Sequence, residues 1–493
     1  MSRKITLSRA KHYLLPILLI PVLIVLLLLI FSIPHRLQRN QDMKRLSSER
    51  YEAVFCTMFS TGNFNESDFA DYRGIPTVMS DCPSESAGEV ASYIERAISS
   101  GNYVHHIYLG LDPEKLRSSS LHSNRLMKVS LKKYLLPIIE AHPEITFEVL
   151  FPTPSMEYWA NKEEADITKV LAAYSITASA LTQYGNVSLY YVGAEDWLIK
   201  NSANYDRDTD ESGTLLTEEM ARHLLLLTFC DGKYRLDRDS ITPYFQGVNL
   251  KILTDKAKPA VYPDLSDLCI VFLGDSIIGN FSGSLSVPGA TAALSGATTY
   301  NLAVGGTPAV LGDADDDLSF LRVLDYLIQG NEDALPADHF YREKLEEYRL
   351  RDTSKRLCFV INYGLNDYFG GCRVADPADP YNTNTYAGAL RTGLIRLKEA
   401  YPEAEIILAT PNFVSVFENG SQLTSDVGSV LTDYVDAALT VAEECDVLCL
   451  DNYHDLGVNA ETAEEYLQDM CHLSDSGRYL YAVKLVRFIE GHQ

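Results

Sequence analysis

Short apolar runs alternate along the chain with longer stretches in which apolar residues recur at every third or fourth position. The first pattern predicts buried β-strands and the second predicts amphipathic helices, and their alternation is typical of a parallel α/β architecture. The scheme occurs twice. Strands are predicted in the first half at EAVFCTMF, VHHIYLGL, ITFEVLFP and VSLYYVG, and in the second half at LCIVFLG, TYNLAV, LCFVINYG, EIILATP and DVLCLD.

One apolar stretch is of a different kind. Residues 13–33 contain no charged side chain, and about 20 such residues are enough to span the hydrocarbon core of a bilayer. Because no small-x-small cleavage site follows, we expect an uncleaved transmembrane signal-anchor helix between a short basic cytoplasmic tail, 1–12, and a polar stalk, 34–50. Lys and Arg flank both ends of the span, so their count alone leaves the orientation open. The short basic N-terminus and the large remainder favour a location of the bulk of the chain outside the cytoplasm.

The length of 493 residues predicts two domains. We expect an α/β domain over 51–243 and a second domain over 268–493. The linker is placed at 244–267, where Pro259 and Pro263 lie in a segment without a clear period.

Residues that can carry chemistry follow the predicted strands of the second domain. Ser276 follows the first strand, Gly306 ends NLAVGG after the second, Asn366 lies in GLND after the third, and Asp469 and His472 form a D-x-x-H pair before the last helix. Because the carboxyl ends of parallel strands meet at one edge of a sheet, we expect these groups to converge.

The chemistry of these groups predicts their roles. A serine hydroxyl becomes a good nucleophile when an imidazole takes its proton, and a carboxylate can orient that imidazole, so Ser276, His472 and Asp469 are predicted as nucleophile, base and orienting acid. The side-chain amide of Asn366 and the backbone N–H of Gly306 are predicted donors to an oxyanion. The tandem Gly305-Gly306 leaves the second donor open by one residue, and Gly306 is chosen from its distance to Asn301. None of these roles requires a metal or another cofactor.

Taken together and in this order, the four motifs resemble those of the SGNH, or GDSL-type, serine hydrolase family over about residues 268–490. Ile277 stands where the family has its name-giving leucine. The resemblance implies a flavodoxin-like three-layer α/β/α fold. It also implies a Ser/His/Asp mechanism with Ser, Gly and Asn in the oxyanion hole, and esterase or acyltransferase activity.

The first domain repeats parts of the second. VFCTMFSTGNF at 54–64 has the length, opening and ending of VFLGDSIIGNF at 271–281. We interpret the halves as two copies of one fold, with a generic α/β pattern as the alternative explanation. In this alignment Phe59, Asp112 and Leu215 stand opposite Ser276, Asn366 and His472, so the first copy is predicted to be catalytically inactive.

Composition narrows the choice of partner. A formal net charge of −25 argues against nucleic acid or another anionic polymer. The nine cysteines contain no CxxC pair, so neither a disulfide framework nor a zinc site is predicted. We interpret His454 as a loop histidine, the acidic run 313–317 as a solvated face and Cys471 as a packing thiol.

The leading hypothesis is a membrane-anchored serine esterase that removes O-acyl groups such as acetate from an extracytoplasmic glycan or lipid. One alternative is an O-acyltransferase to a cell-envelope polysaccharide, which would use the same serine and a membrane acyl-donor protein. The other is a non-catalytic glycan-binding or scaffold protein in which both halves are recognition modules.

Overall fold

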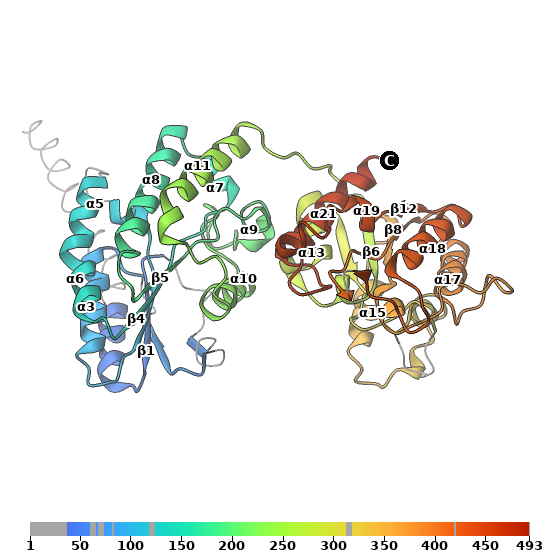
Figure 1. The fold of residues 1–493 in the computed structure, drawn as a ribbon, viewed down its shortest axis with the longest axis horizontal. Helices are drawn as coiled ribbons and strands as arrows, with labels where there is room; N and C mark the ends of the chain where they lie inside the picture. The colour runs from blue at the N-terminus through green and yellow to red at the C-terminus, as the bar shows by residue number, and fades with distance from the viewer. Residues whose placement is uncertain are drawn as a thin grey trace, which may run out of the picture. The chain divides into compact units, whose positions relative to one another are not determined.

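The computed structural model describes residues 37–59, 66–67, 73–80, 83–117, 124–311, 318–418 and 421–492 (Figure 1). The chain divides into two compact units. The first unit comprises Met1–Ala194 and Arg207–Ala257, and the second comprises Glu195–Asp206 and Lys258–Gln493. Within the described ranges, no helix is both long enough and apolar enough to cross a membrane. The predicted span at 13–33 lies outside these ranges.

The second unit is built on a five-stranded parallel sheet of order β12-β9-β8-β6-β7. Its strands are β6 (Leu268–Gly274), β7 (Thr298–Asn301), β8 (Arg356–Asn362), β9 (Glu405–Ala409) and β12 (Leu448–Leu450). Every residue of β6 is buried. A strand covered on both faces reads as a continuous apolar run, which is why LCIVFL is so easily found in the sequence.

Helices cover both faces of this sheet. Right-handed crossovers place the helix between β6 and β7 on one face and the helices that join the other strands on the opposite face. Accordingly, α13 (Val287–Ser295) packs with α21 (Asp475–Glu490), whereas α17 (Tyr386–Ala400) packs between α14 (Phe320–Leu324) and α18 (Leu431–Glu444) (Figure 1). The shorter helices are α12 (Ser276–Gly279), α15 (Tyr341–Arg349), α16 (Leu365–Phe369), α19 (Asn452–Asp455) and α20 (Ala463–Tyr466). The three-layer α/β/α arrangement expected for this domain is present.

The first unit contains a second five-stranded parallel sheet, of order β2-β1-β3-β4-β5. Its strands are β1 (Ala53–Thr57), β2 (Thr77–Met79), β3 (His106–Gly110), β4 (Thr146–Leu150) and β5 (Val187–Tyr190). Its main helices are α3 (Ala87–Ile98), α4 (Pro113–Arg117), α5 (Asn124–Ser130), α6 (Leu136–Ala141), α7 (Met156–Ala160), α8 (Glu164–Leu181), α10 (Glu218–Leu225) and α11 (Ile241–Ala257). If the strands of each sheet are numbered along the chain, both sheets have the spatial order 2-1-3-4-5. Two copies of one fold would share this order.

Residues 54–59 and 271–276, the described part of the first stretch and its counterpart, occupy equivalent places in the two sheets. The N–H of Met58 donates to Gly110 O over 2.7 Å, and the N–H of Asp275 donates to Asn362 O over 3.2 Å. This equivalence sets Phe59 opposite Ser276, as the sequence alignment predicts.

The alignment of Asp112 with Asn366 is wrong by two residues. Gly110 and Asn362 each end a strand, and a helix begins three residues later at Pro113 and Leu365 respectively. Counting from these ends places Glu114 opposite Asn366. The sequence alignment paired Gly110-Leu111 with Gly364-Leu365 because the residues are identical, and this pairing differs from the structural one by two residues. Glu114 accepts from Lys162 over 2.9 Å and carries no amide donor.

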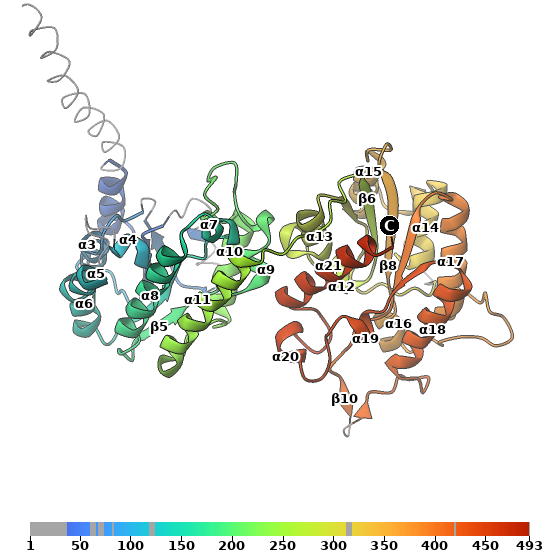
Figure 2. The same cartoon turned by 90° about the horizontal axis from the view of Figure 1, so that it is seen from above.

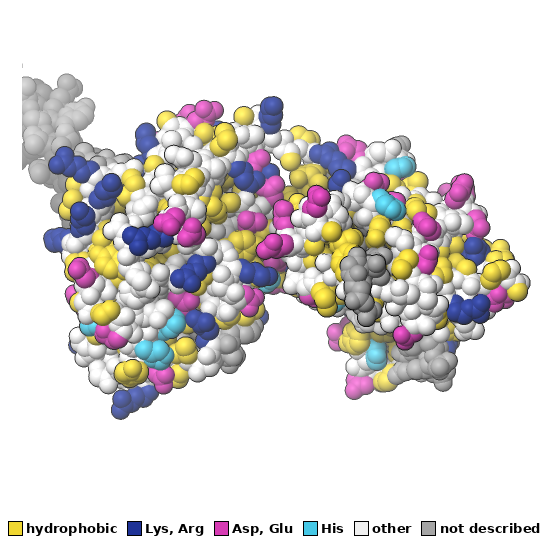
Figure 3. Space-filling model, in the orientation of Figure 1, with side chains coloured by type: hydrophobic (Ala, Val, Ile, Leu, Met, Phe, Trp, Pro, Cys, Tyr) yellow, Lys and Arg dark blue, Asp and Glu magenta, His cyan; other side chains and the backbone are white. Residues whose placement is uncertain are grey.

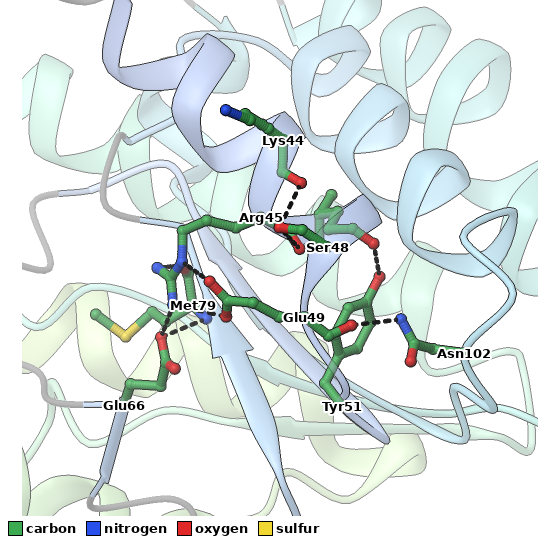
Figure 4. Close-up of polar contacts among 9 residues, drawn as sticks. Lys44, Arg45, Ser48, Glu49, Tyr51, Glu66, Met79 and Asn102 are labelled. Atoms are coloured by element: carbon green, nitrogen blue, oxygen red, sulfur yellow. Dashed lines mark hydrogen bonds and ion pairs between the residues drawn. The ribbon is translucent and has the colours of Figure 1, made fainter.

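The predicted polar stalk is a helix attached to the first unit. Residues 37–48 are helical, and Leu46 is fully buried. Figure 4 shows Arg45 reaching Glu66 and the backbone of Met79, at 2.6 Å and 3.1 Å. Nearby, the Tyr51 hydroxyl donates to Leu46 O over 2.8 Å. The sequence reads as polar here because the helix buries only one narrow face.

The domain boundary also differs from the prediction. Residues 241–257 form helix α11, which packs on α8 and buries Ile241, Phe245, Val248 and Ile252. Pro243 in its first turn, where proline is tolerated, and Gly247 in its middle hid this spacing. The connection between the units is therefore shorter than 244–267.

Glu195–Asp206, from within the predicted first domain, belongs to the second unit. Its short helix α9 (Asp196–Ile199) contacts α21, and the turn Ser202–Asn204 contacts α13. Figure 2 shows α9 and α21 from above. The second unit is thus completed by a segment from the first half of the chain.

Candidate active site

The predicted nucleophile stands at the carboxyl end of the central strand. Strand β6 ends at Gly274, and Ser276 begins the short helix α12. Asp275 lies between them, and its carboxylate accepts from the N–H of Ile277 over 3.0 Å. The side chain of Asp275 therefore caps the helix, while Ser276 remains partly exposed.

His472 and Asp469 reach this serine from a tight loop before α21. Ser276 Oγ lies 3.0 Å from Nε2 of His472, and Nδ1 of the same ring lies 2.8 Å from Oδ2 of Asp469. The loop is closed by the N–H of Gln468, which donates to His472 O over 2.9 Å. The three side chains predicted as a set are therefore in continuous hydrogen-bond contact across 196 residues of sequence.

The loop also stabilises the charge on Asp469. Its Oδ1 accepts from the backbone N–H groups of Cys471 at 2.8 Å and His472 at 2.7 Å. Partial burial acts to raise the pKa of Asp469, but these backbone bonds and the bond to the imidazole outweigh it and hold the pKa below its usual value. A charged Asp469 favours the ring tautomer with its proton on Nδ1, which leaves Nε2 free to accept from the serine hydroxyl.

Asn366 lies at the start of α16, next to the glycine loop. Its Nδ2 donates to Thr307 O over 3.1 Å, so the amide is held beside the residue that follows Gly306. The turn that presents Asn366 depends on Gly364, which has φ +132. A Cβ at Gly364 would lie 2.6 Å from Pro411 Cγ, so only glycine fits there.

The two glycines of the tandem differ in their surroundings. A Cβ on Gly305 would lie 2.3 Å from Asn280 Oδ1 and 3.5 Å from Ser276 Cβ, whereas a Cβ on Gly306 would meet nothing within 4 Å. Gly306 instead has φ +81, in the left-handed region that favours glycine. Gly305 therefore allows close approach to the nucleophile loop, and Gly306 allows the turn.

Asp275 and Asp367 are buried carboxyl groups behind the site that the sequence analysis did not identify. Asp367 accepts from the N–H groups of Ala309 at 2.9 Å and Val310 at 3.0 Å and so ties α16 to the glycine loop. Burial raises the pKa of Asp275 to about 7 and that of Asp367 to about 6. Both residues stand inside the GDS and GLND motifs, which was the available signal.

The structure agrees with the interpretation of Cys471 as a packing thiol but not with that of His454 as a loop histidine. Burial, with the nearby charge of Asp469, raises the pKa of the Cys471 thiol to about 12, so the thiolate needed for nucleophilic attack is scarce at neutral pH. His454 is exposed and lies in the short helix α19, where its Nδ1 is 2.8 Å from Asp451 Oδ2. One ligand atom each from Asp469, Cys471 and His472 lies within 4.8 Å of the others, but Nδ1 of His472 is already bound to Asp469. The acidic run 313–317 lies wholly outside the described residues, which end at 311 and resume at 318.

A serine, a histidine and an aspartate in hydrogen-bond contact at the carboxyl edge of a parallel sheet are arranged as in serine hydrolases. Residues 272–480 match the model of the GDSL-like lipase/acylhydrolase family. The C-terminal half of the chain thus matches the GDSL-like lipase/acylhydrolase family, which confirms the resemblance seen in its motifs.

Solved structures similar to the chain include hydrolases of this type. A protein from Lactobacillus plantarum is 20% identical, with a TM-score of 0.35, covering 48% of this chain and 99% of that one. A possible lipase from Chitinophaga pinensis is 17% identical, with a TM-score of 0.30 and coverage of 45% and 98%. Est24, a carbohydrate acetylesterase from Sinorhizobium meliloti, is 15% identical, with a TM-score of 0.30 and coverage of 46% and 99%. No curated protein matches the chain.

Proposed function

We propose that the protein is a membrane-anchored serine esterase that hydrolyses O-acyl, foremost O-acetyl, esters on an extracytoplasmic glycan or lipid. The observation that carries the proposal is the continuous contact from Ser276 through His472 to Asp469, at 3.0 and 2.8 Å. A serine that donates to an oriented imidazole is activated for attack on a carbonyl carbon.

The reaction would proceed in two steps. Ser276 Oγ attacks the ester carbonyl while Nε2 of His472 takes its proton, and the same nitrogen returns the proton to the departing alcohol. Water then attacks the acyl-serine with His472 again as base, releasing the acid and restoring the serine. Asp469 stays ionised throughout and stabilises the imidazolium.

The negative charge on the carbonyl oxygen would be met by three donors. These are the N–H of Ser276, the N–H of Gly306 and the side-chain amide of Asn366. One hydrogen of this amide already binds Thr307 O, which fixes its plane and leaves the other for the oxyanion. Loss of one such donor typically lowers kcat by about 10²- to 10³-fold.

The proposed location and substrate are supported by two features of the sequence outside the catalytic set. The apolar stretch 13–33 has the length of a membrane span. The net charge of −25 disfavours anionic polymers as substrates and leaves neutral esters favoured.

The proposal is tested with a fluorophosphonate probe, which reacts only with an activated serine. The full chain should be labelled, and Ser276→Ala and His472→Ala should abolish labelling and lower p-nitrophenyl acetate hydrolysis by at least about 10³-fold. His454→Ala is the matched control, since His454 also bonds an aspartate three residues earlier but makes no hydrogen bond to a serine of the described chain. This variant should retain both activities.

Two outcomes would overturn the proposal. A full chain that resists the probe would favour a non-catalytic binding protein. Labelling with no free acetate from acetylated glycans, but with acetyl groups transferred to an added sugar acceptor, would favour acyl transfer.

A further inference from the structure

A groove of about 620 Å³ lies on the first unit. Its floor is helix α8. One wall is the continuous helix formed by α5, the π-helical turn Leu131–Leu135 and α6, and the other wall is α11. The apolar lining residues are Leu131, Leu136, Leu171, Ala172, Ile176, Ala180 and Phe245. Its volume and mostly apolar lining are those of a site for a small hydrophobic ligand.

The wall formed by α5 and the π-helical turn is positively charged. The sequence NRLMKVSLKK, residues 124–133, has four basic residues and no acid, in a chain whose net charge is −25. Lys128 and Lys132, one helical turn apart, are exposed and line the groove. This combination of apolar space and two ammonium groups fits a ligand with a hydrocarbon chain and an anionic head.

The same helix exposes apolar side chains to solvent. Val129 is 53% exposed and Leu126 is 36% exposed, and Leu250 on α11 is 68% exposed. Figure 3 shows Lys and Arg side chains around the position of α5, with apolar side chains among them. Basic and apolar side chains interleaved on one helix are typical of a surface that meets an anionic membrane.

The first unit is also tied closely to the predicted span. Helix 37–48 is fixed to this unit through Leu46 and Arg45, and the span ends at residue 33. Four residues reach at most about 14 Å, so under the proposed anchoring the unit lies close to the bilayer surface.

We propose that this groove binds one acyl chain of an anionic bilayer phospholipid, with the lipid phosphate held by Lys128 and Lys132. The inference rests on the proposed anchoring but not on the esterase activity. It makes the first unit a lipid-recognition module rather than an idle copy.

The experiment uses the full chain in phosphatidylcholine nanodiscs that contain a trace of phosphatidylglycerol with a photoreactive group on one acyl chain. Crosslinks are mapped by mass spectrometry. We expect the crosslinks within residues 168–181 of α8, and we expect unlabelled phosphatidylglycerol but not phosphatidylcholine to displace them. At about a fivefold contribution per lysine near a membrane, Lys128→Gln with Lys132→Gln should lower the apparent affinity about 30-fold.

Two further variants guard the interpretation. Ser175→Phe fills the groove without changing charge and should remove the crosslinks. Lys233→Gln with Lys258→Gln changes the charge equally outside both the groove lining and the basic segment 124–133 and should leave the crosslinks unchanged. Unchanged melting temperatures show that the variants are folded.

Three outcomes would overturn the inference. If the chain inserts but the crosslinks lie outside α8, or are unchanged by Lys128→Gln with Lys132→Gln, the groove is rejected as the binding site. The proposed anchor would be unaffected by that result. A chain that does not enter the nanodisc would reject both the groove and the anchor. Displacement by palmitate as readily as by phosphatidylglycerol would assign the groove to free fatty acids.

Discussion

Two histidines in this chain have the same local geometry but different surroundings. His454 and His472 each place Nδ1 2.8 Å from an aspartate three residues earlier. Only His472 also presents Nε2 to a serine, at 3.0 Å. The local D-x-x-H pattern therefore fixes the tautomer in both cases. The serine contact in only one of them depends on the fold, which brings together residues far apart in sequence.

The two buried carboxyl groups predict a pH-dependent stability. The pKa values of Asp275 and Asp367 are raised by burial to about 7 and about 6, so the folded state holds their protons more tightly than the unfolded chain does. Their contribution to stability is complete below about pH 4, the ordinary carboxyl value, and is lost as the pH rises through 6 to 7.

We therefore expect the unfolding free energy of the second unit to fall by a few kcal/mol between pH 5 and pH 8. Urea denaturation at each pH measures this decline, and Asp367→Asn should make it shallower. Asp264→Asn is the control, since hydrogen bonding from Ser266 holds the pKa of Asp264 below its usual value, outside this window. Equal slopes for the wild type and Asp367→Asn would contradict the assignment.

At the scale of elements, the strands were predicted well and the surface helices less well. β6 is found because both of its faces are buried, which leaves no polar positions to interrupt the run. Strand β2 was missed because it has only three residues. Helix α11 was missed because Pro243 and Gly247 break a pattern whose buried positions have the helical spacing.

The site was predictable to the extent that its groups lie in short motifs. Ser276, Asn366 and the D-x-x-H pair are each next to a strand or helix end, so the sheet topology brings them together. Arg478 has no such signal, because a buried arginine in a helix looks like any surface arginine in sequence. Its partners, Leu285 O and Leu473 O, are backbone atoms that no sequence pattern marks.

We expect Arg478 on α21 to hold the loop that carries His472 in place. The guanidinium donates to Leu473 O, next to His472, and to Leu285 O beyond the nucleophile helix, each at 2.6 Å. It also pairs with Asp475 and is only 3% exposed. Arg478→Leu leaves Asp475 without this cation and should lower the unfolding free energy by about 3–5 kcal/mol.

The same variant should slow fluorophosphonate labelling at a temperature where it is still folded, because the loop that holds His472 loses an attachment. Arg478→Lys should restore part of the rate. Arg487→Leu, on the same helix but exposed, should change neither quantity appreciably. A labelling rate unaffected by Arg478→Leu would mean that the guanidinium serves stability alone.

At the scale of the whole molecule, the second unit depends on residues from the first half of the chain. Leu198 of α9 is fully buried, and Asn201 Nδ2 donates to Ser284 O over 3.3 Å. A fragment of residues 258–493 contains the predicted catalytic set but lacks this segment. It should therefore be less stable than the same unit in the full chain.

Leu198→Ala in the full chain should lower the unfolding free energy of the second unit by about 2–5 kcal/mol. Leu250→Ala, on an exposed position of α11, should change it by no more than about 0.5 kcal/mol. Both are measured by calorimetry on the intact chain. A fragment 258–493 as stable as the complete unit would show that Glu195–Asp206 contributes nothing.

The borrowed segment also affects the order of assembly during synthesis. Glu195–Asp206 leaves the ribosome about 270 residues before helix α21, its packing partner. At about 5–20 residues per second, the interval is on the order of 15 to 60 s. During that time the apolar side chains of α9 lack the helix against which they pack in the folded protein. The nascent chain therefore exposes an apolar, aggregation-prone segment within a first unit that is otherwise complete. We expect a chaperone to be needed first at this segment.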